Sequence, residues 1–154
     1  MNQKLTALFL LISLYSIGQE RINSKNHYAL TGAFALLSGA ADGFNQALSF
    51  RYDAVERKLN LPDRFWNPSI SWLNKYKGND AKRGAKFTGS KGPLVFLTDG
   101  YHLTRFASNL FNAGAVAIQF NGHKRKWHYY VLKGLSYWIV NRAGFSLTYN
   151  QFKN

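Results

Sequence analysis

The sequence predicts a mainly α-helical protein, a bundle of about three long helices that follows an N-terminal signal segment. Three stretches after the first 18 residues carry apolar residues at helical spacing. The chain of 154 residues has the length of one domain. It contains no cysteine, so packing must stabilise it without disulfide bonds or cysteine-ligated metal. We therefore expect a signal peptide over residues 1–18 and one helical domain over residues 19–154.

The first 18 residues have the organisation of an export signal. Lys4 precedes a nearly unbroken hydrophobic run, Leu5–Leu14, and Ser16–Gly18 then offers the small residues that a signal peptidase recognises. The run is shorter than the ~20 apolar residues of a membrane span, and a retained N-terminal anchor is the alternative. For an exported protein, the net charge of +13 indicates anionic lipid or an acidic envelope polymer as the partner, rather than nucleic acid.

The first long helix is expected from His27 to about Leu59. At about 100° per residue, one arc of this helix collects polar side chains: His27, Thr31, Ser38, Asp42, Asn45, Gln46, Ser49, Asp53 and Glu56. The opposite side is apolar. Gly39 and Gly43 form a GxxxG pair, which lets another backbone approach closely. A homo-oligomer that packs through this Gly39/Gly43 face is one expectation, and tight packing within the chain is the other.

Residues 60–92 are expected to form a long aromatic and basic loop between the first two helices. Prolines, tryptophans and turn-forming residues are concentrated there, with a short helix expected near Ser69–Tyr76. Aromatic rings beside cations can bind glycans by stacking, and the alternative is that they cover the core. The candidate binding residues of this loop are Trp66, Trp72, Lys75, Lys77, Lys82, Arg83 and Lys86.

The second helix is expected over residues 93–119, because Ser90 and Pro93 supply a cap and a first-turn proline. One side of this helix is polar, with Arg105, Ser108, Asn109 and Asn112. The third segment, residues 128–149, is expected to be helical. It is dense in Tyr, Trp, Ile and Val, so a strand pair broken near Gly144 is the alternative.

These segments fit a membrane-associated protein or a soluble periplasmic one. All three are long enough to span a bilayer, but the second contains Asp99, His102 and Arg105. Basic residues in the connection Arg51–Lys91 and tryptophans near segment ends favour membrane association. The alternative is a soluble periplasmic bundle whose core consists of the aromatic residues.

Two related stretches, D-G-F-N at Asp42 and D-G-Y-H at Asp99, carry the candidate chemistry. In each, a polar residue follows three positions after the aspartate, Asn45 or His102, and such positions share a helix face. If the two helices pack with their glycines facing, then Asp42, Asp99 and His102 converge as ligands of a divalent metal.

The candidate catalytic residues are accordingly Asp42, Asp99, His102, Arg105 and Glu56. Glu56, Asp53 or His27 would supply the general base. They would serve a small metal-assisted hydrolase that acts on an envelope lipid or glycan. The alternative, which we favour, is structural pairing of Asp42 without a cofactor, with Arg105, Arg142 or a tyrosine hydroxyl as the partner and an arginine preferred. No Gly-rich phosphate loop, serine-nucleophile elbow or H-E-x-x-H motif occurs in the chain.

Five blocks carry a resemblance: IGQE at the end of the signal, then NHYALTGAF, ADGFNQAL, FWNPSISWLNKYKGND and LTDGYHLTR. Together they resemble a class of small uncharacterised envelope proteins of bacteria and their phages, which have an export signal and D-G-[FY] helices. The resemblance covers most of the mature chain. It implies a location in the cell envelope and no specific activity.

Overall fold

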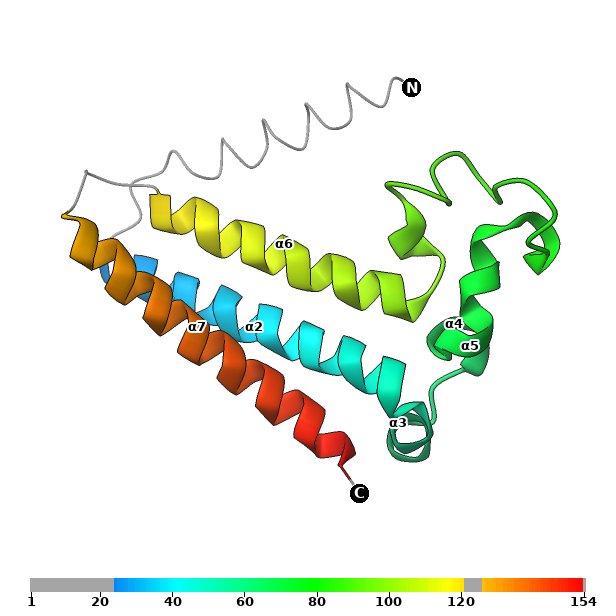
Figure 1. Ribbon diagram of the computed structural model, residues 1–154, viewed down its shortest axis with the longest axis horizontal. Helices are drawn as coiled ribbons and strands as arrows, with labels where there is room; N and C mark the ends of the chain where they lie inside the picture. The colour runs from blue at the N-terminus through cyan, green and yellow to red at the C-terminus, as the bar shows by residue number, and fades with distance from the viewer. Residues whose placement is uncertain (1–23, 121–125, 154) are drawn as a thin grey trace.

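The computed structural model describes residues 24–120 and 126–153, and over these ranges the chain is mainly helical, as predicted. Three long helices run through it: α2 (Ser24–Phe50), α6 (Gly100–Phe120) and α7 (Trp127–Tyr149). Figure 1 shows α2 between α6 and α7, and α2 packs against both, whereas α6 and α7 make few contacts with each other. The predicted signal peptide, residues 1–18, lies outside the described residues.

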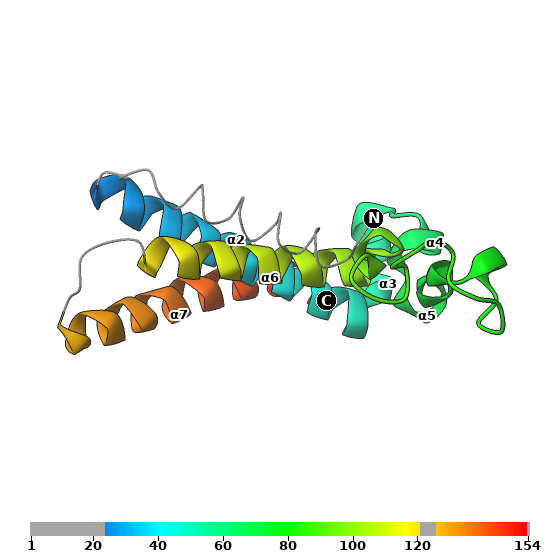
Figure 2. The ribbon, with the colours of Figure 1, turned by 90° about the horizontal axis from the view of Figure 1, so that it is seen from above.

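The shorter elements gather at one end of the three long helices (Figure 2). They are α3 (Tyr52–Leu59), α4 (Asp63–Trp66) and α5 (Pro68–Ser71), followed by the 3₁₀ turns η1 (Trp72–Lys75), η2 (Lys77–Asn79) and η3 (Val95–Leu97). A last turn, η4 (Asn150–Phe152), follows α7. The short helix expected near Ser69–Tyr76 corresponds to α5 and η1.

The prediction of one helix from His27 to Leu59 was wrong, because the chain turns at Arg51. Arg51 leaves the helical region with φ −144° and ψ 33°. Its Nε donates to the hydroxyl of Tyr149 at 3.0 Å, and its guanidinium lies 5.1 Å from the centre of that ring. This contact with the end of α7 separates α2 from α3, and no proline or glycine marks the turn in the sequence.

The second helix begins at Gly100 rather than at Pro93, because Asp99 provides the N-cap. The Asp99 carboxylate accepts a hydrogen bond from the backbone N–H of His102 at 2.9 Å, which satisfies one of the free donors of the first turn. The third segment is the helix α7, so the strand-pair alternative was wrong.

Glycines allow α7 to lie directly against α2. A Cβ on Gly39 would lie 1.9 Å from the carbonyl oxygen of Asn141, and a Cβ on Gly144 would lie 2.2 Å from that of Leu36. Gly43 faces α7 in the same way. The Gly39/Gly43 face, which the sequence offers to a second copy, is therefore occupied by α7 of the same chain.

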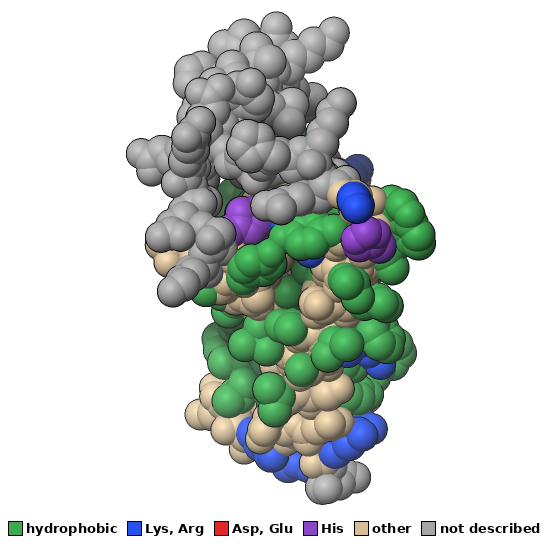
Figure 3. All heavy atoms as spheres, turned by 90° about the vertical axis from the view of Figure 1, so that its left-hand side faces the viewer, with side chains coloured by type: hydrophobic (Ala, Val, Ile, Leu, Met, Phe, Trp, Pro, Cys, Tyr) green, Lys and Arg blue, Asp and Glu red, His purple; other side chains and the backbone are tan. Residues whose placement is uncertain are grey.

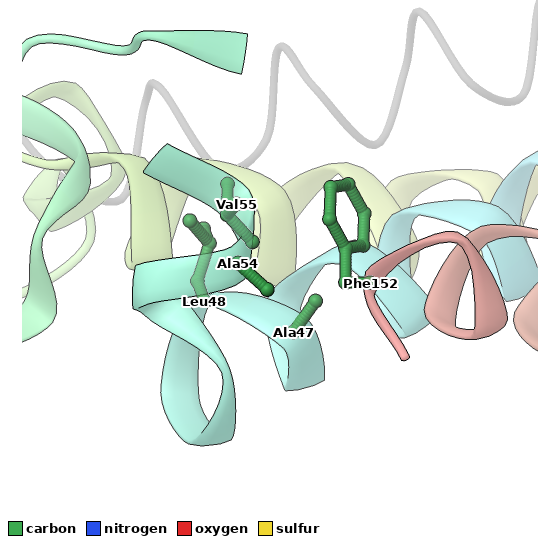
Figure 4. Packing of buried hydrophobic residues seen from close by; sticks show 5 residues of the cluster. All are labelled: Ala47, Leu48, Ala54, Val55 and Phe152. Atoms are coloured by element: carbon green, nitrogen blue, oxygen red, sulfur yellow. The ribbon is translucent and has the colours of Figure 1, made fainter. Parts of the chain in front are cut away.

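The hydrophobic core lies where the end of α2 meets α3 and η4 (Figure 4). Leu48 and Val55 are its most deeply buried large side chains, and Phe152 closes it from the C-terminal end. The buried members of this core cluster are Ala47, Leu48, Ala54, Val55 and Phe152. The large apolar side chains of the described core are thus concentrated at one end of the long helices.

None of the helices in residues 24–120 and 126–153 combines the length and hydropathy needed to cross a membrane.

Candidate functional site

A polar cavity of about 350 Å³ lies between the three long helices, away from the core cluster. α2 contributes two of its lining residues, α6 four and α7 two. This space is called the polar cavity, and it is lined by Ser38, Asp42, Arg105, Ser108, Asn109, Asn112, Tyr137 and Asn141. Tyr137 is its one aromatic lining residue in the described chain.

The middle of the predicted polar arc, Ser38, Asp42 and Asn45, faces the other long helices, whereas Ser49, Asp53 and Glu56 are exposed. Ser38 is fully buried, and its hydroxyl donates to the carbonyl oxygen of Ser108 at 3.1 Å. Asn45, with 1% exposed, donates from Nδ2 to the carbonyl of Tyr101 at 2.7 Å and to the hydroxyl of Thr104 at 2.9 Å. Since buried polar groups must find partners, these bonds fix α6 against α2 and set the positions of the cavity walls.

Asp42 and Arg105 both line the polar cavity without pairing with each other. Within the described ranges, ion pairs join Asp80 to Arg83 and Asp99 to His102, and none involves Asp42 or Arg105. Nor does either of these two side chains make a hydrogen bond to another described residue. The expected pairing of Asp42 with an arginine was therefore wrong for this part of the chain.

Two amide side chains of the cavity are oriented by bonds to neighbouring groups. The hydroxyl of Tyr137 donates to Oδ1 of Asn112, which leaves the Nδ2 group of Asn112 as the remaining donor. Nδ2 of Asn141 donates to the carbonyl oxygen of Ala35 at 3.3 Å, which leaves Oδ1 of Asn141 as an acceptor.

The two sides of the polar cavity consequently differ in character. On α6, Arg105 and the Nδ2 group of Asn112 are hydrogen-bond donors, and Arg105 carries a positive charge. On α2 and α7, the Asp42 carboxylate and Oδ1 of Asn141 are acceptors, and Asp42 carries a negative charge. A positive group on α6 and a negative group on α2 therefore line one cavity of small-molecule size, which is open to solvent where Arg105 and Asn109 are exposed.

Asp99 and His102 form a separate, local group at the start of α6. The Asp99 carboxylate is 1% exposed and accepts from the hydroxyl of Thr98 at 2.9 Å and from Nδ1 of His102 at 2.8 Å. These bonds and the capping bond occupy both carboxylate oxygens, and a carboxylate is favoured at a helix N-terminus.

The structure does not bring Asp42 together with Asp99 and His102. Asp42 faces the polar cavity, whereas the oxygens of Asp99 are turned toward its own helix start. In residues 24–120 and 126–153, no group of three or more His, Cys, Asp or Glu side chains is placed to hold a metal ion. Glu56 lies exposed on α3, outside the polar cavity.

The two Asp-Gly stretches therefore have different roles. Gly43 admits the backbone of α7, whereas Gly100 admits an indole ring. A Cβ on Gly100 would lie 2.2 Å from Cε3 of Trp66. The ring of Trp66 also packs edge-on against Phe44, with 5.8 Å between ring centres, so this tryptophan contributes to packing.

Residues 75–86, called the basic hairpin below, form a closed loop. The backbone N–H of Lys77 donates to the carbonyl of Gly84 at 3.0 Å, and that of Lys86 donates to the carbonyl of Lys75 at 2.9 Å. The loop has one acidic residue, Asp80. Its exposed basic side chains are Lys77, Lys82, Arg83 and Lys86. Trp72, which is 41% exposed, lies beside it with Lys75 near its ring.

Compared with known proteins, the chain matches no family model, no curated protein and no solved structure.

Proposed function

We propose that this chain is a membrane-associated helical protein of the cell envelope. Its outward apolar surface would lie against lipid, and its basic hairpin would contact anionic headgroups. The observation that carries the proposal is an inverted distribution of side chains, with polar groups between the long helices and large apolar groups outside. The predicted export signal supports the envelope location.

The inverted distribution is clearest on α7. Tyr137, Asn141 and Gly144 lie on the side of α7 that faces α2 or the polar cavity. The opposite side exposes about half or more of each of four large apolar side chains: Val131, Leu135, Trp138 and Ile139. An exposed apolar surface of this kind marks an interaction site for protein or membrane.

The residues buried between the long helices are small or polar. Away from the core cluster, the buried apolar positions there are alanines, Ala35 and Ala115. The buried polar positions of α2 and α6 are Ser38, Asn45, Thr104 and Ser108. Polar side chains that face inward and apolar side chains that face outward are typical of helices that contact lipid.

Charge favours lipid over a second protein as the partner of this surface. Figure 3 shows the end of the molecule at which α7 begins, where hydrophobic side chains occupy much of the described surface and no acidic side chain is visible there. The net charge of +13 and the basic hairpin complement anionic headgroups. The proposed contact is lateral, with the outward apolar side chains of α7 against the headgroup region.

Vesicle flotation tests this proposal. We expect the protein to float with phosphatidylcholine vesicles that contain phosphatidylglycerol, and to float less when phosphatidylglycerol is omitted or salt is raised. The double variant Leu135→Gln, Ile139→Gln removes two outward side chains that are 54% and 59% exposed. At about 1 kcal/mol for each half-buried side chain, partitioning should fall about 30-fold.

The matched control replaces two exposed apolar residues outside α7, Leu59→Gln and Ile70→Gln, and should leave flotation near the wild-type level. A monomer that stays at the bottom of the gradient with every vesicle composition would refute the proposal. Equal loss in both double variants would show that the α7 surface is not the site of contact.

A further inference from the structure

We infer that the polar cavity binds a small zwitterion that carries a phosphate and a primary ammonium group, the chemistry of phosphoethanolamine. The inference goes beyond membrane association and does not depend on it. It is based on two opposite charges that line one cavity and leave each other unpaired.

The α6 side of the cavity suits the phosphate. The guanidinium of Arg105 has no described partner, and its planar set of donors matches phosphate oxygens. Asn112 keeps its Nδ2 group as a donor, because the hydroxyl of Tyr137 already occupies its Oδ1. Asn109 lines the same side, one turn after Arg105. Several donors on one wall suit an anion with more than two oxygens better than a carboxylate.

The lining from α2 and α7 suits the ammonium group. The Asp42 carboxylate supplies the negative charge, and Oδ1 of Asn141 supplies a second acceptor. A primary ammonium has three N–H donors for such acceptors, whereas a quaternary ammonium has none and is usually bound by several aromatic rings. Since Tyr137 is the one aromatic ring in the described lining, the cavity should prefer phosphoethanolamine to phosphocholine.

The volume of the cavity fits a headgroup-sized molecule. At about 350 Å³ it lies near the lower end of the ~300–1,000 Å³ range of small-molecule sites. The same chemistry occurs in free phosphoethanolamine and in the headgroup of phosphatidylethanolamine, so the experiment includes one arm for each source.

Isothermal titration calorimetry with phosphoethanolamine, phosphocholine and inorganic phosphate tests the soluble arm. We expect measurable binding of phosphoethanolamine and weaker binding of phosphocholine. Arg105→Gln should lower the affinity for both phosphoethanolamine and inorganic phosphate by about tenfold or more. Asp42→Asn should lower the affinity for phosphoethanolamine but not for inorganic phosphate, because inorganic phosphate has no ammonium group.

Arg57→Gln and Asp53→Asn, which change exposed residues of α3, are the matched controls and should bind like the wild type. The lipid arm compares flotation with phosphatidylcholine vesicles that do or do not contain phosphatidylethanolamine. If the protein floats better with phosphatidylethanolamine and Asp42→Asn removes this preference, the ligand is the lipid headgroup. If the protein binds only soluble phosphoethanolamine, the ligand is the free molecule.

Absence of binding in both arms, or Arg105→Gln and Asp42→Asn variants that bind like their controls, would overturn the inference. The outcome is separable from that of the proposed function. If the protein does not float but binds soluble phosphoethanolamine, the membrane proposal is refuted and the binding site is supported. If the protein floats equally with and without phosphatidylethanolamine and binds no soluble probe, the membrane proposal is supported and the binding site is refuted.

Discussion

Replacing Gly39 by alanine should destabilise the protein, although alanine is the better helix former. Real Cβ atoms essentially never lie closer than 3.0 Å to such a neighbour, and a Cβ at this position would lie 1.9 Å from the carbonyl oxygen of Asn141. That oxygen belongs to the backbone of α7 and cannot rotate away. The two helices would therefore have to separate by about 1 Å or distort locally.

The magnitude follows from two opposing terms. Overpacking of a tight contact costs about 1–3 kcal/mol, and the rigid backbone neighbour places Gly39→Ala at the upper end. Better helix propensity returns about 1 kcal/mol, for a net loss of about 2 kcal/mol. Gly32 lies in the same helix with nothing within 4 Å of its Cβ position, so Gly32→Ala should gain about 1 kcal/mol.

Chemical denaturation followed by far-UV circular dichroism measures both variants against the wild type. The two should differ by about 3 kcal/mol, and thermal midpoints should separate by about 6–12 °C for a chain of this length. A second pair repeats the test on α7, with Gly144→Ala at the contact and Gly134→Ala in open space. If Gly39→Ala and Gly32→Ala shifted stability in the same direction by the same amount, the close crossing of α2 and α7 would be refuted.

Two further predictions concern stability and its pH dependence. Asp99→Ala should cost about 2–3 kcal/mol, because it removes the cap of α6 and leaves the His102 donors without their partner, whereas the exposed control Asp53→Ala should cost much less in the same denaturation assay. Burial and the hydrogen bond that Tyr52 donates to Asp63 at 2.5 Å raise the pKa of Tyr52 above its ordinary value of 10.0. The folded state then holds this proton more tightly than the unfolded state, so stability should fall as the pH rises above 10.0, and a Tyr52→Phe variant with the same fall would contradict this reasoning.

The helical content of the chain could be predicted from the sequence because apolar residues recur with a helical period. The bounds of the helices could not. Arg51 ends α2 through its contacts with Tyr149, a residue 98 positions later. The residues next to Arg51 in the sequence do not indicate such a contact. Pro93 is a good start signal for a helix, but the buried carboxylate of Asp99 caps α6 instead.

The cavity was only partly predictable. Asp42 and Arg105 are candidate residues in the sequence because charges in apolar segments need partners. Their placement in one cavity without pairing depends on the directions of three helices, which periodicity does not contain. Tyr137 gives no signal, since a tyrosine in an apolar segment is typical of a core position. The proposed metal ligands shared spacing along the chain, but Asp42 and Asp99 lie in different environments.

The sequence by itself determined that the chain is helical and basic, that α2 has one polar arc, and that Gly39 and Gly43 admit a close neighbour. These properties follow from residue type and from the fixed period of a helix. Only the tertiary structure decided that the neighbour is α7, that the middle of the polar arc faces inward, and that large apolar side chains of α7 remain exposed. The physical reason is that periodicity defines the faces of a helix, whereas the contacts between helices determine which face is buried.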